Sequence, residues 1–411
     1  MPGFYRENMR WLAGGFLLAL FSSFGQTFFI SIWGAEIRAA FSLTHGGFGF
    51  IYMAATLASA ATLPFIGPMV DVLSVARTSL VVILLLAAAA LVMGSAHSVA
   101  MLAVALYMLR LFGQGMMTHT SITAMGKWYS ANRGKAVSFA TIGHQFGEGL
   151  APATFIAIAA YVGWRGSWFV AAALLLFGAL PLIYTLMRVE RVPRSQAVQD
   201  SKALETGRQW TRAEMLRDPL FWLTGFGVFT PAFIGTSMFF HQDYLIALNG
   251  WPRWLYDTSF AGMAVTTVVV SLATGIAIDR VGAVRILPFF MLPLGISCLS
   301  LGLLDEAKTI IIFMLFLGLS YGMSSTLFGA FWPEVYGTRH LGSIRAITVS
   351  LMVLMSAVGP GVTGLLIDWG VPFQEQLLYM AAYCFVCIAL MAVAARGYGA
   401  RTAQAAKLPR R

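Results

Sequence analysis

Charged side chains are scarce in this sequence. Asp, Glu, Lys and Arg make up 11% of its 411 residues, whereas a soluble domain carries about 25%. Apolar residues make up 58%, and the mean hydropathy is +0.76. So few charges cannot cover the surface of a soluble fold of this length, and this excludes an ordinary cytosolic enzyme and a disordered chain. The composition indicates a polytopic membrane protein.

Cysteine is also rare, and the sequence lacks the common motifs of cofactor chemistry. Cys298, Cys384 and Cys387 all lie in apolar runs, which excludes a secreted disulfide scaffold. The sequence shows neither a phosphate-binding glycine loop with lysine nor a metal-ligand or nucleophile pattern. We therefore expect no cofactor, no metal, no enzymatic activity and no ATP-driven transport.

Long apolar runs fill most of the chain. A helix needs about 20 apolar residues to cross roughly 30 Å of hydrocarbon. Segments of this kind are predicted at 11–33, 46–66, 78–95, 99–123, 136–161, 167–187, 219–241, 256–276, 284–304, 309–331, 344–366 and 374–395. The runs are continuous, whereas a membrane barrel would show short alternating segments. The spans are therefore predicted to be helices.

The spans fall into two sets of six, separated by the longest polar stretch. We expect an all-α polytopic membrane protein with 12 transmembrane helices in two pseudo-symmetric six-helix bundles. The bundles are predicted at 1–187 and 218–411, and the linker at 188–217. Residues 210–217 are predicted to form a short surface helix that leads into span 219–241, with a mobile linker throughout as the alternative.

Basic residues set the orientation. With the N-terminus inside, most Lys and Arg fall in loops on the inner side, while Arg38, Arg165, Arg253 and Lys308 lie outside. The positive-inside rule then places both termini in the cytoplasm, with the protein in the plasma (inner) membrane. The same distribution explains the net charge of +10 without a nucleic-acid partner.

A short pattern occurs twice. Gly67, Asp71 and Arg77 recur as Gly275, Asp279 and Arg285, at a constant offset of 208 residues. Each copy lies at the cytoplasmic end of the second span of its half. This repeat predicts two halves of the same topology, as in transporters whose repeats are related by an axis along the membrane normal.

Three motifs in this order resemble those of the major facilitator superfamily, and the resemblance covers nearly the whole chain. They are Gly67…Asp71…Arg77, then Arg110-Leu111-Phe112-Gly113-Gln114-Gly115, then Gly143-His144-Gln145-Phe146-Gly147 with Pro152. The resemblance implies a secondary transporter that works by alternating access. One departure is that Val72 follows Asp71, where the family usually has a basic residue.

The resemblance also implies a gating role for the repeated pattern. Asp71 would face the start of span 344–366 near Ser343 and Arg345, and Asp279 would face the start of span 136–161 near Arg133 and Gly134. A carboxylate at a helix N-terminus gains about 0.3–1 kcal/mol. These contacts would exist only when the cytoplasmic side is closed. The predicted gating set is Gly67, Asp71, Arg77, Gly275, Asp279, Arg280 and Arg285, and the alternative is a set of loop charges that only fix topology.

Arg110 lies roughly 16 Å into span 99–123, at ~1.5 Å per residue. An arginine there costs at least about 2.5 kcal/mol, so we expect a partner. Glu148 lies at a similar depth in the next span, so we predict that the two form a pair. His144 precedes Glu148 by one helical turn, which makes the three side chains a candidate proton relay. The alternatives are a static structural pair and a permanently neutral histidine.

The first helices of each half line the cavity in this family, so Gln26 and His241 are candidate substrate contacts. The predicted substrate or proton path is Gln26, Arg110, His144, Gln145, Glu148 and His241. The motif Trp128-Tyr129…Arg133-Gly134-Lys135-Ala136 looks closest to monocarboxylate- and oxalate-type carriers. Those carriers usually have a basic residue in the eighth span, and this sequence has none there, so an anion site would depend on Arg110 and His241.

We therefore expect a monomeric carrier in the lipid bilayer that moves a small solute, best an organic anion such as a monocarboxylate, together with protons. The alternative is an efflux carrier for drug-like or other small molecules. A membrane-embedded transferase or a transporter-like sensor is less favoured. The charged cluster lies at mid-membrane, where an enzyme site is not expected, and the sequence has no large soluble segment that a sensor would add.

Overall fold

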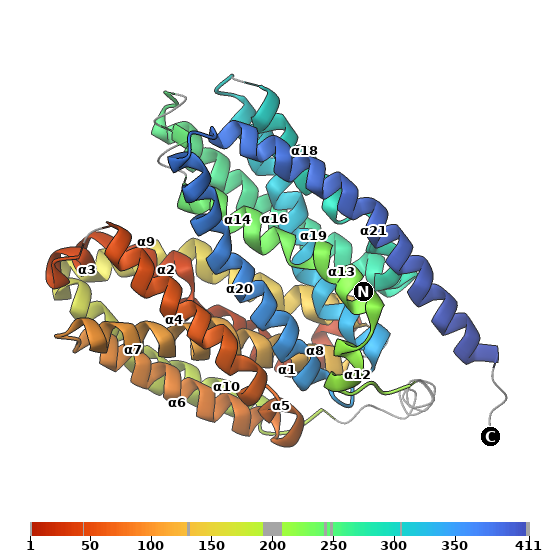
Figure 1. Ribbon diagram of the computed structural model, residues 1–411. Helices are drawn as coiled ribbons and strands as arrows, with labels where there is room; N and C mark the ends of the chain where they lie inside the picture. The colour runs from red at the N-terminus through yellow and green to blue at the C-terminus, as the bar shows by residue number, and fades with distance from the viewer. Residues whose placement is uncertain are drawn as a thin grey trace. The chain divides into compact units, whose positions relative to one another are not determined.

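The computed structural model describes residues 2–43, 45–129, 132–191, 208–241, 245–246, 250–304 and 306–407 (Figure 1). All regular secondary structure in these ranges is helical. Eleven segments within them are long and apolar enough to cross a membrane. The predicted class, an all-α polytopic membrane protein, is confirmed.

The helices of the N-terminal part of the chain are α1 (Pro2–Phe21), η1 (Ser22–Gly25), α2 (Thr27–Ser31), α3 (Gly34–Phe41), α4 (His45–Ile66), α5 (Met69–Val72), α6 (Val75–Gly94), α7 (Val99–Leu109), η2 (Arg110–Met117), α8 (Thr118–Trp128), α9 (Arg133–Ala173), η3 (Leu174–Ala179) and α10 (Leu180–Met187). After the linker follow α12 (Arg212–Leu216), α13 (Pro219–Val228), α14 (Thr230–Phe240), α16 (Arg253–Val281), α17 (Ala283–Ile286), α18 (Met291–Leu303), α19 (Thr309–Tyr336), α20 (Leu341–Asp368) and α21 (Phe373–Lys407).

The helix α9 contains the predicted span 136–161 and the start of the predicted span 167–187, which continues through η3 and α10. It is interrupted at Gly163, whose φ of 73° and ψ of 171° are not helical. Positive φ is the region that glycine enters without steric cost. The interruption falls between the predicted spans 136–161 and 167–187, so each is a separate helix. The predicted arrangement of twelve helices agrees with the structure.

The chain forms two compact units. Unit 1 consists of Met1–Ser130, Phe139–Val198 and His340–Leu351, and unit 2 of Ala131–Ser138, Gln199–Arg339 and Met352–Arg411. Each unit thus contains most of one half of the sequence and the start of one helix from the other half: α20 begins in unit 1, and α9 begins in unit 2. The predicted domain boundaries, 1–187 and 218–411, stay a prediction.

Side-by-side helices build the core of each unit. In unit 1, α6 packs against α7 and α10, and α4 packs against α7 (Figure 1). In unit 2, α19 packs against α16 and α18, and α21 packs against α18 and α13. Trp168 in unit 1 and Trp332 in unit 2 are among the largest fully buried side chains.

The predicted short helix before span 219–241 is confirmed as α12. It begins with a capping box, in which the Thr211 hydroxyl accepts from the Glu214 backbone N–H and the Glu214 carboxylate accepts from the Thr211 backbone N–H. This arrangement satisfies donors that a helix start otherwise leaves without a partner. Residues 192–207 of the predicted linker lie outside the described residues.

Candidate functional site

The first span is broken in unit 1. Helix α1 ends at Phe21, a 3₁₀ turn follows over η1, and Gln26 is extended, with φ −84° and ψ 153°. Helix α2 then begins at Thr27. Irregular backbone at membrane depth is tolerated where it is buried in protein or lines a water-filled cavity. The break therefore leaves backbone carbonyls available to other groups inside the protein.

Glycines bring the broken span close to the fourth span. A Cβ at Gly25 would overlap the carbonyl oxygen of Leu109 and approach the Cα of Gly113. The fourth span is itself irregular, because η2 is a π-helical segment between α7 and α8. Such segments occur often at functional sites. Two backbone irregularities therefore meet at one place.

Arg110 is the first residue of η2, and its side chain is 2% exposed. Its Nη1 donates to the carbonyl oxygen of Gly25 at 3.1 Å and to Oγ1 of Thr27 at 3.2 Å. The guanidinium carbon lies 5.3 Å from the centroid of the Tyr52 ring, and the Tyr52 hydroxyl donates to the same Thr27 Oγ1 at 2.9 Å. The cation is thus held by neutral groups.

The other edge of the Arg110 guanidinium makes no hydrogen bond within the described chain. Its Nε is buried without a hydrogen-bond partner. Within the described ranges, neither Nη2 nor any other atom of this side chain takes part in an ion pair. The Nε–Nη2 edge presents two parallel N–H groups, which match the two oxygens of a carboxylate. Chemically, this edge can bind one carboxylate or a similar anion.

The predicted pair between Arg110 and Glu148 is wrong for this structure: no ion pair joins them, although both residues are described. The reason lies in the first span. Its break frees the Gly25 carbonyl, and this oxygen and Thr27 take the place that Glu148 was expected to fill. A break of this kind leaves no signal in the hydrophobic pattern from which the spans were predicted.

His144 and Glu148 nevertheless lie in unit 1 with Arg110. The His144 ring meets the Phe28 ring edge-on, with 5.8 Å between centroids, and its Nδ1 is buried and has no hydrogen-bond partner among the described residues. Phe28 is next to Thr27, so the short segment 27–28 contacts both Arg110 and His144. Glu148 is half-buried and makes no hydrogen bond or ion pair with any other part of the chain that the structure describes.

The two glutamines of the predicted path differ. Gln26 is 7% exposed, and its Nε2 donates to Ser22 Oγ at 3.3 Å and to Thr118 Oγ1 at 3.4 Å. It therefore ties the broken first span to the fourth. Gln145 is half-buried and has no side-chain hydrogen bond among the described residues.

His241 lies in unit 2, directly after α14. It is half-buried, and its ring centroid lies 5.6 Å from that of Phe373. The structure thus gathers Gln26, Arg110, His144 and Glu148 in unit 1 and places His241 in the other unit.

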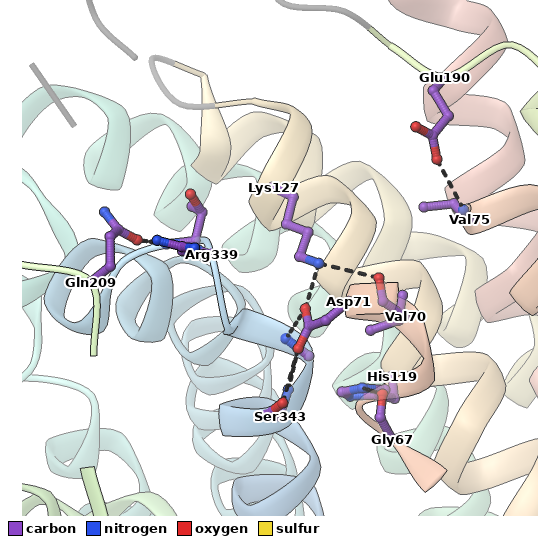
Figure 2. Close-up of polar contacts among 12 residues, drawn as sticks. Gly67, Val70, Asp71, Val75, His119, Lys127, Glu190, Gln209, Arg339 and Ser343 are labelled. Atoms are coloured by element: carbon purple, nitrogen blue, oxygen red, sulfur yellow. Dashed lines mark hydrogen bonds and ion pairs between the residues drawn. The ribbon is translucent and has the colours of Figure 1, made fainter. Parts of the chain in front are cut away.

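A second polar site in unit 1 is centred on Asp71 (Figure 2). Its carboxylate accepts from the backbone N–H of Gly342 at 2.8 Å and of Ser343 at 2.7 Å, and from the Ser343 hydroxyl at 3.1 Å. Lys127 Nζ forms an ion pair with it at 2.5 Å. Since α20 begins at Leu341, the carboxylate caps a helix start. The predicted position of Asp71 near Ser343 is confirmed.

The equivalent site in unit 2 is centred on Asp279. Its carboxylate accepts from the backbone N–H of Gly134 at 2.8 Å and of Lys135 at 3.2 Å, at the start of α9. Lys135 Nζ lies 3.6 Å from the carboxylate. Burial lowers the pKa of Arg133, just before the predicted span, to about 10, although Glu334 and Asp279 oppose the shift. The predicted position of Asp279 near Gly134 is confirmed.

The glycines of the repeated pattern allow the close approach that the sequence predicts. A Cβ at Gly67 would overlap that of Ala346, and a Cβ at Gly275 would come within 2.7 Å of the Gly134 carbonyl oxygen and 2.8 Å of Ser138 Oγ. Ala346 lies 208 positions after Ser138. The residues that contact the two glycines are therefore separated by the same offset as the glycines themselves.

The sequence did not predict Lys127 and Lys135 as partners of these aspartates. Lys127 supplies the positive charge that is missing directly after Asp71, and its position at the end of the fourth span was the available signal. Conversely, Arg77, Arg280 and Arg285 are exposed, and their side chains make no hydrogen bond or ion pair within the described chain.

Comparisons with known proteins agree on the fold. The model of one family, the Major Facilitator Superfamily, matches residues 15–360. The structure of the human organic anion transporter MFSD10 (TETRAN) is similar with a TM-score of 0.72 and 15% identity, over 93% of this chain and 99% of that one. The structure of the E. coli fucose:proton symporter FucP is similar with a TM-score of 0.70 and 14% identity, over 94% of this chain and 98% of that one.

The proton:xylose symporter XylE, bound to 6-bromo-6-deoxy-D-glucose, gives a TM-score of 0.66 and 14% identity, over 94% of each chain. At these identities the likeness shows the fold alone. No curated protein matches the sequence.

Proposed function

Because this chain belongs to the major facilitator superfamily and is an integral membrane transporter, we propose that it carries a small organic anion, such as a monocarboxylate, by alternating access and together with protons. It works as a monomer in the plasma (inner) membrane, with both termini in the cytoplasm. The uneven distribution of basic residues between its loops supports this orientation.

The observation that carries the proposal is the state of Arg110. This arginine lies near the middle of a membrane span, is 2% exposed, is held by Gly25, Thr27 and Tyr52, and forms no ion pair with a carboxylate of the described chain. A charge at this depth is costly and marks a substrate or ion pathway. An anionic substrate would neutralise the guanidinium through its Nε–Nη2 edge, and this gives the transporter its preference for anions.

Glu148 supports the coupling to protons. Its carboxyl lies in the same unit as Arg110 and forms no ion pair with a described residue, so it can take up and release a proton during the cycle. His144, one helical turn away, has a buried ring nitrogen without a partner and can pass a proton on. The similar fold of two proton symporters is consistent with this assignment.

Asp71 and Asp279 act as gates in this proposal. Each carboxylate holds a helix start by two backbone hydrogen bonds, and each contact breaks when the inner side opens. The contacts thus favour the state in which that side is closed. The offset of 208 residues between both aspartates and both of their partners supports a matched pair of gates.

The test is uptake of labelled anions into membrane vesicles that contain the protein, with and without a pH gradient. A panel of monocarboxylates, a dicarboxylate and a neutral sugar identifies the substrate class. We expect saturable monocarboxylate uptake that an inward proton gradient increases. Arg110→Lys is the matched variant, since it keeps the charge but loses the planar pair of donors. Uptake of the neutral sugar alone, unchanged in Arg110→Ala, would contradict the proposal.

A further inference from the structure

We propose that the linker between the two halves positions the Asp71 gate, through Glu190 near its start and Gln209 just before α12. The inference rests on the proposed gating role of Asp71 and goes beyond it, because neither residue belongs to the repeated pattern. In this inference the linker stabilises the Asp71 gate and not the Asp279 gate.

The start of the linker is docked on unit 1. The Glu190 carboxylate accepts from the backbone N–H of Val75 at 3.3 Å (Figure 2). The next residue, Arg191, donates from its Nε to Asn8 Oδ1 at 3.1 Å, and its guanidinium lies 4.2 Å from the centroid of the Tyr129 ring. Several contacts thus fix the position from which Glu190 reaches the start of α6.

The end of the linker is docked on unit 2. The side-chain oxygen of Gln209 accepts from the backbone N–H of Thr338 at 3.0 Å and of Arg339 at 3.2 Å (Figure 2). The backbone N–H of Trp210 donates to the Tyr336 carbonyl oxygen at 3.0 Å, and their rings pack edge-on at 5.4 Å. This end therefore holds the turn that connects α19 to α20.

The two docked segments flank the Asp71 contact in the sequence. Val75 follows Asp71 by four residues, at the start of the next helix. Thr338 and Arg339 come shortly before Gly342, whose N–H binds Asp71. One side of the gate is the segment from Asp71 in α5 to Val75 in α6, and the other is the segment from Thr338 to Gly342 in α20. The linker contacts the Val75 end of the first segment and the Thr338 end of the second. Loss of either restraint should loosen the geometry that lets Asp71 reach two N–H groups.

Near Asp279, the hydrogen bond that corresponds to the one between Glu190 and Val75 comes from a residue outside the linker. The residue that lies 208 positions after Val75 is Ala283, and its N–H donates to Glu334 at 2.7 Å, while that of Val284 donates to Glu334 at 3.3 Å. Glu334 belongs to α19, a core helix, and not to the linker. At the equivalent positions Val75 and Ala283, the acceptor comes from the linker near Asp71 and from a core helix near Asp279.

The experiment measures how fast a buried cysteine behind each gate reacts with a membrane-impermeant maleimide from the cytoplasmic side. Ala346→Cys reports the Asp71 gate and Ser138→Cys the Asp279 gate, because both side chains are 0% exposed and are related by the offset. The background carries Cys298→Ala, Cys384→Ala and Cys387→Ala. Glu190→Ala and Gln209→Ala remove the acceptors, whereas Glu190→Gln and Gln209→Glu keep an oxygen at each position.

We expect Glu190→Ala and Gln209→Ala to speed labelling of Ala346→Cys by roughly two- to tenfold, the factor for loss of one net hydrogen bond. The same variants should raise the labelling rate of Ser138→Cys less. The conservative variants Glu190→Gln and Gln209→Glu should keep the slow labelling rate at Ala346→Cys. Glu334→Ala should show the opposite preference. An unchanged rate at Ala346→Cys, an equal rise at both cysteines, or a failure of the conservative variants would overturn the inference.

Asp71→Asn separates this inference from the gating proposal. If Asp71→Asn leaves the labelling of Ala346→Cys unchanged, Asp71 is not a gate, and both the proposal and the inference fail. If Asp71→Asn speeds labelling while the Glu190 and Gln209 variants do not, the gate stands and the role of the linker is wrong.

Discussion

The carboxylate of Asp279 accepts a hydrogen bond at 2.8 Å from the backbone N–H of Gly134, which lies in the other half of the sequence. Asp71 makes the same bond to Gly342 at the same distance. Asp279 lies 208 positions after Asp71, and Gly342 lies 208 positions after Gly134. The repeat in the sequence is therefore also a repeat in contacts. The two equivalent contacts support the proposal that both aspartates act as gates.

The first prediction concerns these aspartates. Asp71→Asn and Asp279→Asn should each change the transport rate more than the amount of folded protein, because in the proposed cycle each weakens a contact that exists only when the cytoplasmic side is closed. The loss of charge at a helix start removes about 0.3–1 kcal/mol. Transport rate and yield after purification, measured side by side, test this. A rate and state distribution equal to those of the wild type would make the aspartates topological charges only.

The second prediction concerns Lys127, which stands in for the basic residue missing after Asp71. Lys127→Ala should raise the rate of maleimide labelling at Ala346→Cys, and Lys127→Arg should restore it. Lys135→Ala is the matched variant at the Asp279 gate and should have the smaller effect, because its ion pair is 3.6 Å long against 2.5 Å for Lys127. Equal labelling in Lys127→Ala and the wild type would remove this lysine from the gate.

The third prediction follows from the absence of an ion pair between Arg110 and Glu148 in the described structure. Arg110→Ala should abolish anion uptake, and the addition of Glu148→Ala should not restore it or the yield of folded protein. A true pair would behave differently, because removing one partner leaves a buried charge that costs about 3–5 kcal/mol and removing both relieves it. Recovery of folded protein in the double variant would show that the two side chains pair in another state.

The fourth prediction concerns the proton. Glu148→Gln should abolish accumulation driven by a pH gradient while leaving exchange of labelled for unlabelled substrate, since a fixed neutral amide cannot release a proton. Counterflow and pH-driven uptake in the same vesicle preparation make the comparison. Coupled accumulation that survives Glu148→Gln would exclude Glu148 from the proton path.

The fifth prediction concerns the break in the first span. Gly25→Ala should lower the amount of folded, active protein, because the new Cβ would overlap the Leu109 carbonyl oxygen and push the first span away from the fourth. Gly149→Ala is the control, since a Cβ at that position meets nothing within 4 Å. Detergent-solubilised yield and anion uptake report the outcome, and equal behaviour of the two variants would contradict the packing argument.

The sequence by itself determined the class of the protein and the position of its spans. These depend on the sum of many apolar residues over about 20 positions, and no single contact can change that sum. It also located the helix-start contacts of Asp71 and Asp279 to within a residue or two, because both aspartates belong to a repeat whose two copies share one geometry.

Only the tertiary structure decided which groups surround Arg110. Its partners are a backbone carbonyl at Gly25 and the hydroxyl of Thr27, and they become available because the first span unwinds where two glycines meet. Depth along a helix predicts which side chains share a layer of the membrane, and on that basis Glu148 was the natural partner. It does not predict which face each side chain occupies or where a helix breaks, because both depend on packing between helices that lie far apart in the sequence.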